Sequence, residues 1–226
     1  MNTTKFNGDS WVDIYKNTGF GNKYPSSYFV SLFHSEIKNL FAECDKIKVL
    51  DFGCSFGANS KMLLDSGRCD VYGIDISEVA IKYCVDNNNL PASQFISTNV
   101  LEEGIPFDEQ FDLIVCTEVL QYFDNQNIHN LLNLFIDHLN EGGVLYASMP
   151  TSNHCLYCNY VYDEKYDNMM KIPKSHTADR ELYANPVVDK QDIERKMLPF
   201  KTISVYLTSE ERKEGLNEEI HYIGRI

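Results

Sequence analysis

The residues most suited to bind a ligand lie at the ends of two short apolar runs. Asp51 opens the turn 51–57, with the sequence Asp-Phe-Gly-Cys-Ser-Phe-Gly, and Asp75 ends the run that follows. Glycines at 53 and 57 let the backbone turn sharply and approach a ligand closely, and a helix starting after 57 would offer free N–H groups. A carboxylate at 75 can accept hydrogen bonds from both hydroxyls of a ribose. This spacing predicts a site for a nucleoside-type cofactor.

The turn also indicates which nucleoside it suits. Its pattern is G-x-x-x-G, whereas loops that bind a dinucleotide pyrophosphate read G-x-G-x-x-G. Asp51 would repel a diphosphate but suits a ligand with an ammonium group, such as S-adenosylmethionine. Here the sequence resembles the class I S-adenosylmethionine-dependent methyltransferases, whose first motif is an acid, an apolar residue and G-x-G-x-G. Ser55 stands in place of the middle glycine.

The resemblance covers residues 45–150 most clearly. It implies that Asp75 binds the ribose, that Ile76 lies beside the adenine, and that Asn99 meets the adenine amino group. The lead-in W-x-x-x-Y at Trp11 and Tyr15 resembles that of small-molecule relatives and could fold over the cofactor as a lid. The cofactor-binding residues predicted in this way are Trp11, Tyr15, Asp51, Gly53, Cys54, Ser55, Gly57, Asp75, Ile76, Asn99, Val100 and Cys116.

Transfer of a methyl group to an alcohol calls for a general base, whereas a carboxylate, phosphate or unprotonated amine acceptor needs none. The bases that the sequence offers are Glu118, His154 and His176. Residues 121–122 are Gln-Tyr where many relatives carry histidine, so no base can be carried over there. Residues 154–158, His-Cys-Leu-Tyr-Cys, would need a fourth ligand to hold zinc, and we expect no metal site.

The elements that must position these residues alternate between apolar strands and amphipathic helices. Such alternation predicts an α/β fold with a parallel sheet covered on both faces. The predicted helices are 28–44, 59–64, 77–85, 126–139 and 189–198, and the predicted strands are 47–52, 70–75, 94–97, 112–116, 143–148, 202–207 and 220–225. The resemblance implies a Rossmann-like, doubly wound, seven-stranded sheet of order 3-2-1-4-5-7-6 with an antiparallel last strand.

We expect one domain over residues 1–226. Within it, residues 1–45 form a lid and helix and residues 46–150 the cofactor-binding core. Residues 151–187 are a substrate-side insert without a clear period, and residues 188–226 supply a helix and a strand pair.

Composition restricts the partners. The 226 residues include 33 acidic and 20 basic side chains, a net charge of −13, so we expect no nucleic-acid ligand. The apolar runs are far shorter than the roughly 20 residues of a membrane span. The start of the chain shows no signal pattern, and the seven scattered cysteines are typical of reduced thiols. These features favour a cytoplasmic protein.

The sequence therefore predicts methyl transfer from S-adenosylmethionine, with S-adenosylhomocysteine as product. The expected acceptor is an oxygen atom of a small molecule, a metabolite, sugar or glycan precursor. Alternatives are a protein or RNA methyltransferase, an NAD-dependent oxidoreductase, and a cofactor-binding protein without catalysis. The identity of the acceptor, the base that is used and the oligomeric state stay open.

Overall fold

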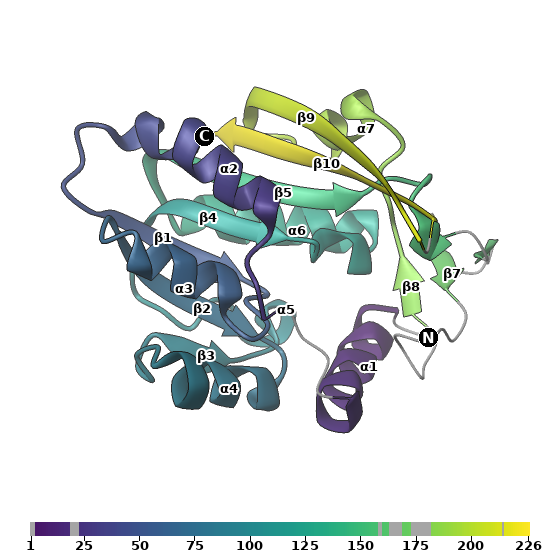
Figure 1. The fold of residues 1–226 in the computed structure, drawn as a ribbon, viewed down its shortest axis with the longest axis horizontal. Helices are drawn as coiled ribbons and strands as arrows, with labels where there is room; N and C mark the ends of the chain where they lie inside the picture. The colour runs from purple at the N-terminus through teal and green to yellow at the C-terminus, as the bar shows by residue number, and fades with distance from the viewer. Residues whose placement is uncertain (1–2, 19–22, 158–159, 163–168, 173–181, 214) are drawn as a thin grey trace.

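The computed structural model describes residues 3–18, 23–157, 160–162, 169–172, 182–213 and 215–226. A seven-stranded sheet forms its centre (Figure 1), in the order β3-β2-β1-β4-β5-β10-β9. The strands are β1 (Ile47–Phe52), β2 (Cys69–Asp75), β3 (Phe95–Ser97), β4 (Phe111–Thr117), β5 (Leu139–Pro150), β9 (Lys201–Arg212) and β10 (Gly215–Arg225). Strands β1 to β5 pair in parallel, and β10 is antiparallel to both of its neighbours. The predicted order 3-2-1-4-5-7-6 is confirmed, with β9 and β10 as its last two strands.

Helices cover both faces of the sheet, as the doubly wound prediction requires. They are α2 (Ser27–Ser35), α3 (Ala58–Asp65), α4 (Glu78–Asn88), α5 (Val100–Glu103), α6 (Asn125–Asp137) and α7 (Lys190–Lys196). One core joins α2, α3 and α4 to the sheet through residues such as Phe29, Leu63 and Cys84. The other joins α6 and α7 to the opposite face through Phe135 and Ile193. Burial of these apolar side chains is the main source of the fold's stability.

The predicted helix 28–44 is interrupted. The helix α2 ends at Ser35, and a short 3-10 helix occupies Ile37–Phe41. The break falls at Glu36, whose carboxylate accepts hydrogen bonds from the hydroxyls of Ser204 and Tyr206 on β9. This long-range contact, which the local apolar spacing does not reveal, anchors the chain where the helix breaks.

Two regions contain elements that the sequence did not predict. Residues Thr3–Thr18 form α1, which lies beside β8 near the ends of the parallel strands (Figure 1). Within the insert, β6 (Val161–Tyr162), β7 (Met170–Ile172) and β8 (Leu182–Ala184) form a small antiparallel sheet. These strands have two or three residues, too few to show an alternating pattern. The insert therefore builds a second, smaller sheet beside the carboxyl ends of the main strands.

Candidate cofactor and acceptor site

The loop between β1 and α3 has an unusual backbone. Gly53, Ser55 and Gly57 all adopt positive φ, at 70°, 51° and 74°. A Cβ at position 53 would lie 2.4 Å from a methyl group of Val119, so only glycine fits there. The loop therefore has the alternating left-handed geometry of a G-x-G-x-G turn, and Ser55 adopts it as a non-glycine residue.

Two buried carboxyls face this loop. Ser60 donates its hydroxyl to Asp51, and the backbone N–H groups of Ser55 and Ser77 donate to the two oxygens of Asp75 at 2.9 and 3.0 Å. Burial raises the pKa of each carboxyl to about 6, and repulsion by Asp75 adds to the increase at Asp51. In the part of the chain that the structure describes, no basic side chain contributes to the pKa of either carboxyl. Two buried carboxyls without a cationic partner suit a ligand that brings positive charge and hydroxyl donors, which fits S-adenosylmethionine.

Helix α1 covers the loop. The Tyr15 ring lies 5.5 Å from the Phe56 ring, and the side chains of Tyr15 and Ser55 are hydrogen-bonded. Burial, followed by the charge of Asp75, raises the pKa of Tyr15. The Trp11 ring meets the Tyr122 ring edge-on at 5.1 Å between centroids. The structure thus places Tyr15 against the loop, and Trp11 packs beside it against Tyr15 and Tyr122.

The side chain of Asn7 fixes this helix in place. Its amide nitrogen donates to the backbone oxygens of Tyr122 at 2.7 Å and Tyr183 at 2.9 Å, and its oxygen accepts from the N–H of Tyr183 at 2.9 Å. Asn7 is 2% exposed. These bonds tie α1 to β8 and to the segment after β4, so that the insert and the lid close over the same end of the sheet.

The other residues predicted to contact the cofactor differ in their placement. Ile76 and Asn99 are partly exposed at the ends of β2 and β3, with Val100 buried beside them. Cys54 is buried against Cys84 under the loop. Cys116 has no exposed surface and belongs to the core on the α6 face, so its side chain cannot reach a ligand in this conformation.

Glu118 follows β4 and adopts a φ of +54°, a strained conformation for a residue with a side chain. Its N–H donates to the Ser148 carbonyl at 3.0 Å, and its own carbonyl accepts from the Gln121 amide at 2.7 Å. Burial raises the pKa of its carboxyl to about 7, repulsion by Glu219 adds to the increase, and Arg212 opposes it. A carboxyl whose pKa is raised in this way suits the role of a general base at neutral pH.

Glu219 on β10 is a site residue that the sequence analysis missed. It is 8% exposed, and its negative charge contributes to the raised pKa of Glu118. Burial raises the pKa of the Tyr122 and Tyr157 phenols, and the negative charge of Glu118 adds to the increase. Side chains two residues apart in a strand lie on the same face, so Glu219 shares a face with His221. This spacing was the one feature of the sequence that could have indicated an inward-facing carboxyl.

The structure disfavours His154 as the base. Its Nδ1 accepts a hydrogen bond from the N–H of Leu156 at 3.1 Å, and its Nε2 is hydrogen-bonded to the side-chain oxygen of Asn217. Both ring nitrogens are therefore engaged, and burial lowers the pKa of the ring. His176 lies outside the described residues, as does Cys158. Within the described ranges, no group of three or more His, Cys, Asp or Glu side chains could hold a metal ion.

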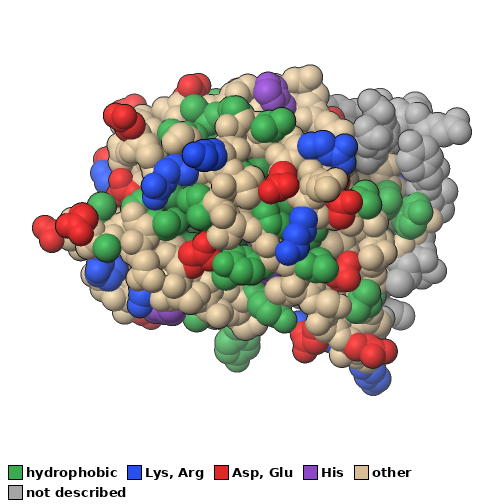
Figure 2. All heavy atoms as spheres, turned by 90° about the horizontal axis from the view of Figure 1, so that it is seen from above, with side chains coloured by type: hydrophobic (Ala, Val, Ile, Leu, Met, Phe, Trp, Pro, Cys, Tyr) green, Lys and Arg blue, Asp and Glu red, His purple; other side chains and the backbone are tan. Residues whose placement is uncertain are grey.

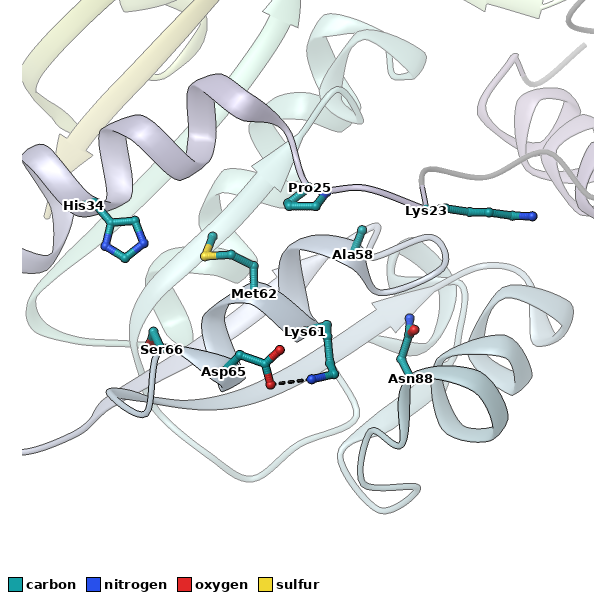
Figure 3. Close-up of a pocket in the computed structure, with 9 residues that line it drawn as sticks. All are labelled: Lys23, Pro25, His34, Ala58, Lys61, Met62, Asp65, Ser66 and Asn88. Carbon is teal, nitrogen blue, oxygen red and sulfur yellow. Dashed lines mark hydrogen bonds and ion pairs between the residues drawn. The ribbon is translucent and has the colours of Figure 1, made fainter.

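A separate groove of about 500 Å³ lies on the outer side of α3 (Figure 3). His34 and Met62 face it from α2 and α3, Asn88 borders it from the end of α4, and Lys61 is paired with Asp65 along its floor. None of the residues predicted to bind the cofactor or the acceptor lines this groove. It is therefore distinct from the site at the strand ends.

The surface adds two findings. On the face shown in Figure 2, basic and acidic side chains are interspersed, and no broad basic area suited to a nucleic-acid backbone stands out there. In the part of the chain that the structure describes, no helix has both the length and the apolar character needed to cross a membrane.

Comparison with known proteins shows which proteins the central part of the chain resembles. Residues 49–143 match the family model described as a methyltransferase domain. Over 108 residues the chain is 30% identical to a carboxy-S-adenosyl-L-methionine synthase of Hamiltonella defensa, covering 45% of this chain and 42% of that protein. Over 145 residues it is 28% identical to a ubiquinone biosynthesis O-methyltransferase of Glaesserella parasuis, covering 62% and 59%. The chain thus spans less than two thirds of either curated relative.

A solved structure agrees over a longer range. The structure of an S-adenosylmethionine-dependent methyltransferase from Methanosarcina mazei superposes with a TM-score of 0.68 at 21% identity. The match covers 84% of this chain and 96% of that chain. At this level of identity, the likeness establishes the shared fold.

Proposed function

We propose that this chain, which carries a class I S-adenosylmethionine-dependent methyltransferase domain, transfers a methyl group to a hydroxyl group of a small molecule. The observation that carries the proposal is the position of Glu118, a carboxyl with a pKa of about 7 at the end of β4. That end of the sheet is also where the loop 53–57 and the buried Asp75 lie. A base beside the cofactor loop is what a hydroxyl acceptor requires.

The chain's own residues divide the work. Asp75 would accept hydrogen bonds from the ribose hydroxyls, and Asp51 would compensate positive charge on the cofactor. When bound, S-adenosylmethionine supplies an electrophilic methyl group on a positively charged sulfur. Helix α1 would exclude water from the site through Trp11 and Tyr15. Glu118 would take the proton of the acceptor hydroxyl. At the same time the hydroxyl oxygen would bond to the methyl carbon, and the bond between that carbon and the sulfur would break.

A small acceptor is favoured over a macromolecule by the cover on the site. The aromatic contact between α1 and Tyr122, and the bonds of Asn7 to β8, close the region over the loop. A protein substrate would call for an open groove, and an RNA substrate would be repelled by the net charge of −13. The ubiquinone biosynthesis O-methyltransferase among the relatives is consistent with a small oxygen acceptor.

Calorimetric titration of the purified chain tests the proposal at its first step. We expect micromolar binding of S-adenosylmethionine and S-adenosylhomocysteine and no binding of NAD. Binding of NAD alone, or of none of the three, would contradict the assignment. With binding established, a panel of phenols, sugars and carboxylates assayed for S-adenosylhomocysteine formation identifies the acceptor, and turnover on carboxylates alone would overturn the hydroxyl assignment.

A further inference from the structure

We propose that Glu118 and Glu219 act as an interacting carboxyl pair, and that the pair selects a positively charged acceptor, an amine-bearing alcohol or phenol, over an anionic one. The inference rests on the proposed function, because Glu118 is the proposed base. It adds the second carboxyl and the charge of the substrate.

The sheet brings the two carboxyls to one place from distant parts of the sequence. The backbone N–H of Glu118 is bonded to Ser148 on β5. In the antiparallel pairing of β5 with β10, Ser148 lies opposite His221. Glu219 is two residues from His221 and therefore projects from the same face of β10. Glu118 and Glu219 thus lie at the same end of the sheet, one after β4 and the other on β10, with only β5 between their strands.

Among the residues that the structure describes, the groups around the pair compensate little of its negative charge. The titratable and charged groups that face it are Arg212 on β9, Tyr122 after β4, Tyr146 on β5, Tyr157 in the insert and His221 on β10. Arg212 is the one cation among them, but its guanidinium is half-exposed and bonded to Glu210 at 2.8 Å. Solvent screens such an exposed charge, so its compensation of the pair is weak.

His221 does not supply a positive charge either. Its ring is hydrogen-bonded to the Tyr146 hydroxyl at 2.9 Å and to the Thr208 hydroxyl at 3.0 Å. Burial lowers the pKa of the ring to about 4, so the imidazole is neutral at pH 7. Its Nε2 lies 4.0 Å from a carboxylate oxygen of Glu219, with no formal charge to offer it.

A buried amide next to the pair also calls for a donor. Gln121 is 1% exposed, and its nitrogen donates to the backbone oxygen of Glu118. Its side-chain oxygen is buried without a hydrogen-bond partner among the described residues. Leaving a buried acceptor without a donor is unfavourable, and a ligand N–H or O–H would supply the missing hydrogen bond.

Together these groups present hydrogen-bond acceptors and negative charge to the acceptor. Two buried carboxyls that repel one another titrate as a unit, so that one member of the pair holds a proton near neutral pH. The ionised member takes the proton of the acceptor hydroxyl, and an ammonium group on the same molecule replaces the missing cation. A carboxylate or phosphate on the acceptor would be repelled by the negative charge of the same pair.

Carbon-13 NMR of the full chain, labelled at the glutamate carboxyl carbons and loaded with S-adenosylhomocysteine, tests the pair directly. We expect the Glu118 resonance to titrate near pH 7 and the Glu219 resonance to move with it. In Glu219→Gln the midpoint of Glu118 should fall by about 1 pH unit, because the repulsion is removed while burial remains. An unchanged midpoint in a folded variant would overturn the pair. This readout does not depend on turnover, so it is separable from a failure of the proposed function.

Glu218→Gln is the matched control, since this neighbour lies on the opposite face of β10 and binds Thr151 and Asn153 instead. Its substitution should leave the Glu118 midpoint in place. Two phenols of similar size, tyramine and 4-hydroxyphenylacetate, then probe the charge preference in the same titration. Tyramine should lower the Glu118 midpoint, and the anion should not. An equal response to both, or none to either, would overturn the preference for a cation.

Discussion

The two halves of the site are built in different ways. The cofactor half depends on one continuous loop, 51–57, and on Asp75, whose two oxygens are already held by the N–H groups of Ser55 and Ser77. The acceptor half is assembled from the segment after β4, the insert and β10. Its central carboxyls, Glu118 and Glu219, repel one another. In the cofactor half, backbone N–H groups already hold the carboxyl of Asp75 in position. In the acceptor half, a positively charged ligand would compensate the negative charge of the two carboxyls.

This difference implies that substitutions in the two halves should fail in different ways. A change in the cofactor half should weaken cofactor binding, because its groups hold ground-state contacts. A change at the acceptor pair should spare cofactor binding and reduce turnover, because a general base acts only as the acceptor reacts. The predictions below test this separation.

The largest effect is expected at Glu118. Glu118→Gln keeps the size and polarity of the side chain but removes its ability to take a proton. Turnover of the best acceptor from the panel should fall by roughly 10²–10⁴-fold. The dissociation constant for S-adenosylhomocysteine, measured by calorimetry, should stay within about twofold, since Glu118 belongs to the other half.

His154→Ala is the control for this change. Both nitrogens of His154 are held within the protein, so we expect its loss to reduce turnover by less than about threefold in a folded variant. If His154→Ala abolished turnover and Glu118→Gln did not, the base would be the histidine, and the description of the acceptor half would be wrong.

The same contrast explains what the sequence could reveal. The loop, Asp51 and Asp75 lie within one strand-turn-helix unit, where glycine spacing and strand ends define positions along a short stretch. The alternation of strands and helices was predicted for a related reason, because each element has its own period. The order of the strands came from the resemblance to the class I methyltransferases, and the structure confirms it. Glu219 could not be found in this way, since 100 residues separate it from Glu118 and only the pairing of β5 with β10 joins them.

The elements that the sequence did not predict also depend on contacts between distant parts of the chain. Helix α1 includes Asn7 and Gly8, which are poor helix formers. Tertiary contacts, the bonds of Asn7 to β8 and the packing of Trp11 and Tyr15 over the site, hold it in place. The break at Glu36 likewise depends on side chains of β9.

An intermediate effect is expected at Asp75. Asp75→Ala removes a carboxylate that would accept the ribose hydroxyls, and it also frees the N–H groups of the loop. A charge-assisted contact of this kind is worth roughly 1.5–3 kcal/mol, so cofactor affinity should fall by more than about tenfold. Calorimetry measures the loss, and thermal unfolding checks the fold.

Asp70→Ala is the matched control on the same strand, because Asp70 lies at the far end of β2, where it accepts a hydrogen bond from the Gln94 amide. It should leave the cofactor affinity unchanged. Unchanged cofactor affinity in a folded Asp75→Ala variant would show that Asp75 does not bind the ribose. Cofactor binding would then depend on the loop alone.

The smallest effect is expected at Ser55, where the loop departs from the family's glycine. Ser55→Gly relieves a left-handed conformation that costs a side chain roughly 1–2 kcal/mol, but glycine loses about 0.5–1 kcal/mol more backbone entropy on folding. The variant also loses the bond to Tyr15. These contributions nearly cancel, so the melting temperature should move by no more than about 4 °C and the cofactor affinity by less than about threefold. Gly53→Ser, the reverse change two residues away, should be far more damaging, since its Cβ would lie 2.4 Å from Val119. A tenfold gain in cofactor affinity from Ser55→Gly would show instead that the serine weakens cofactor binding. The cofactor half, and not the acceptor pair, would then be the less optimised part of the site.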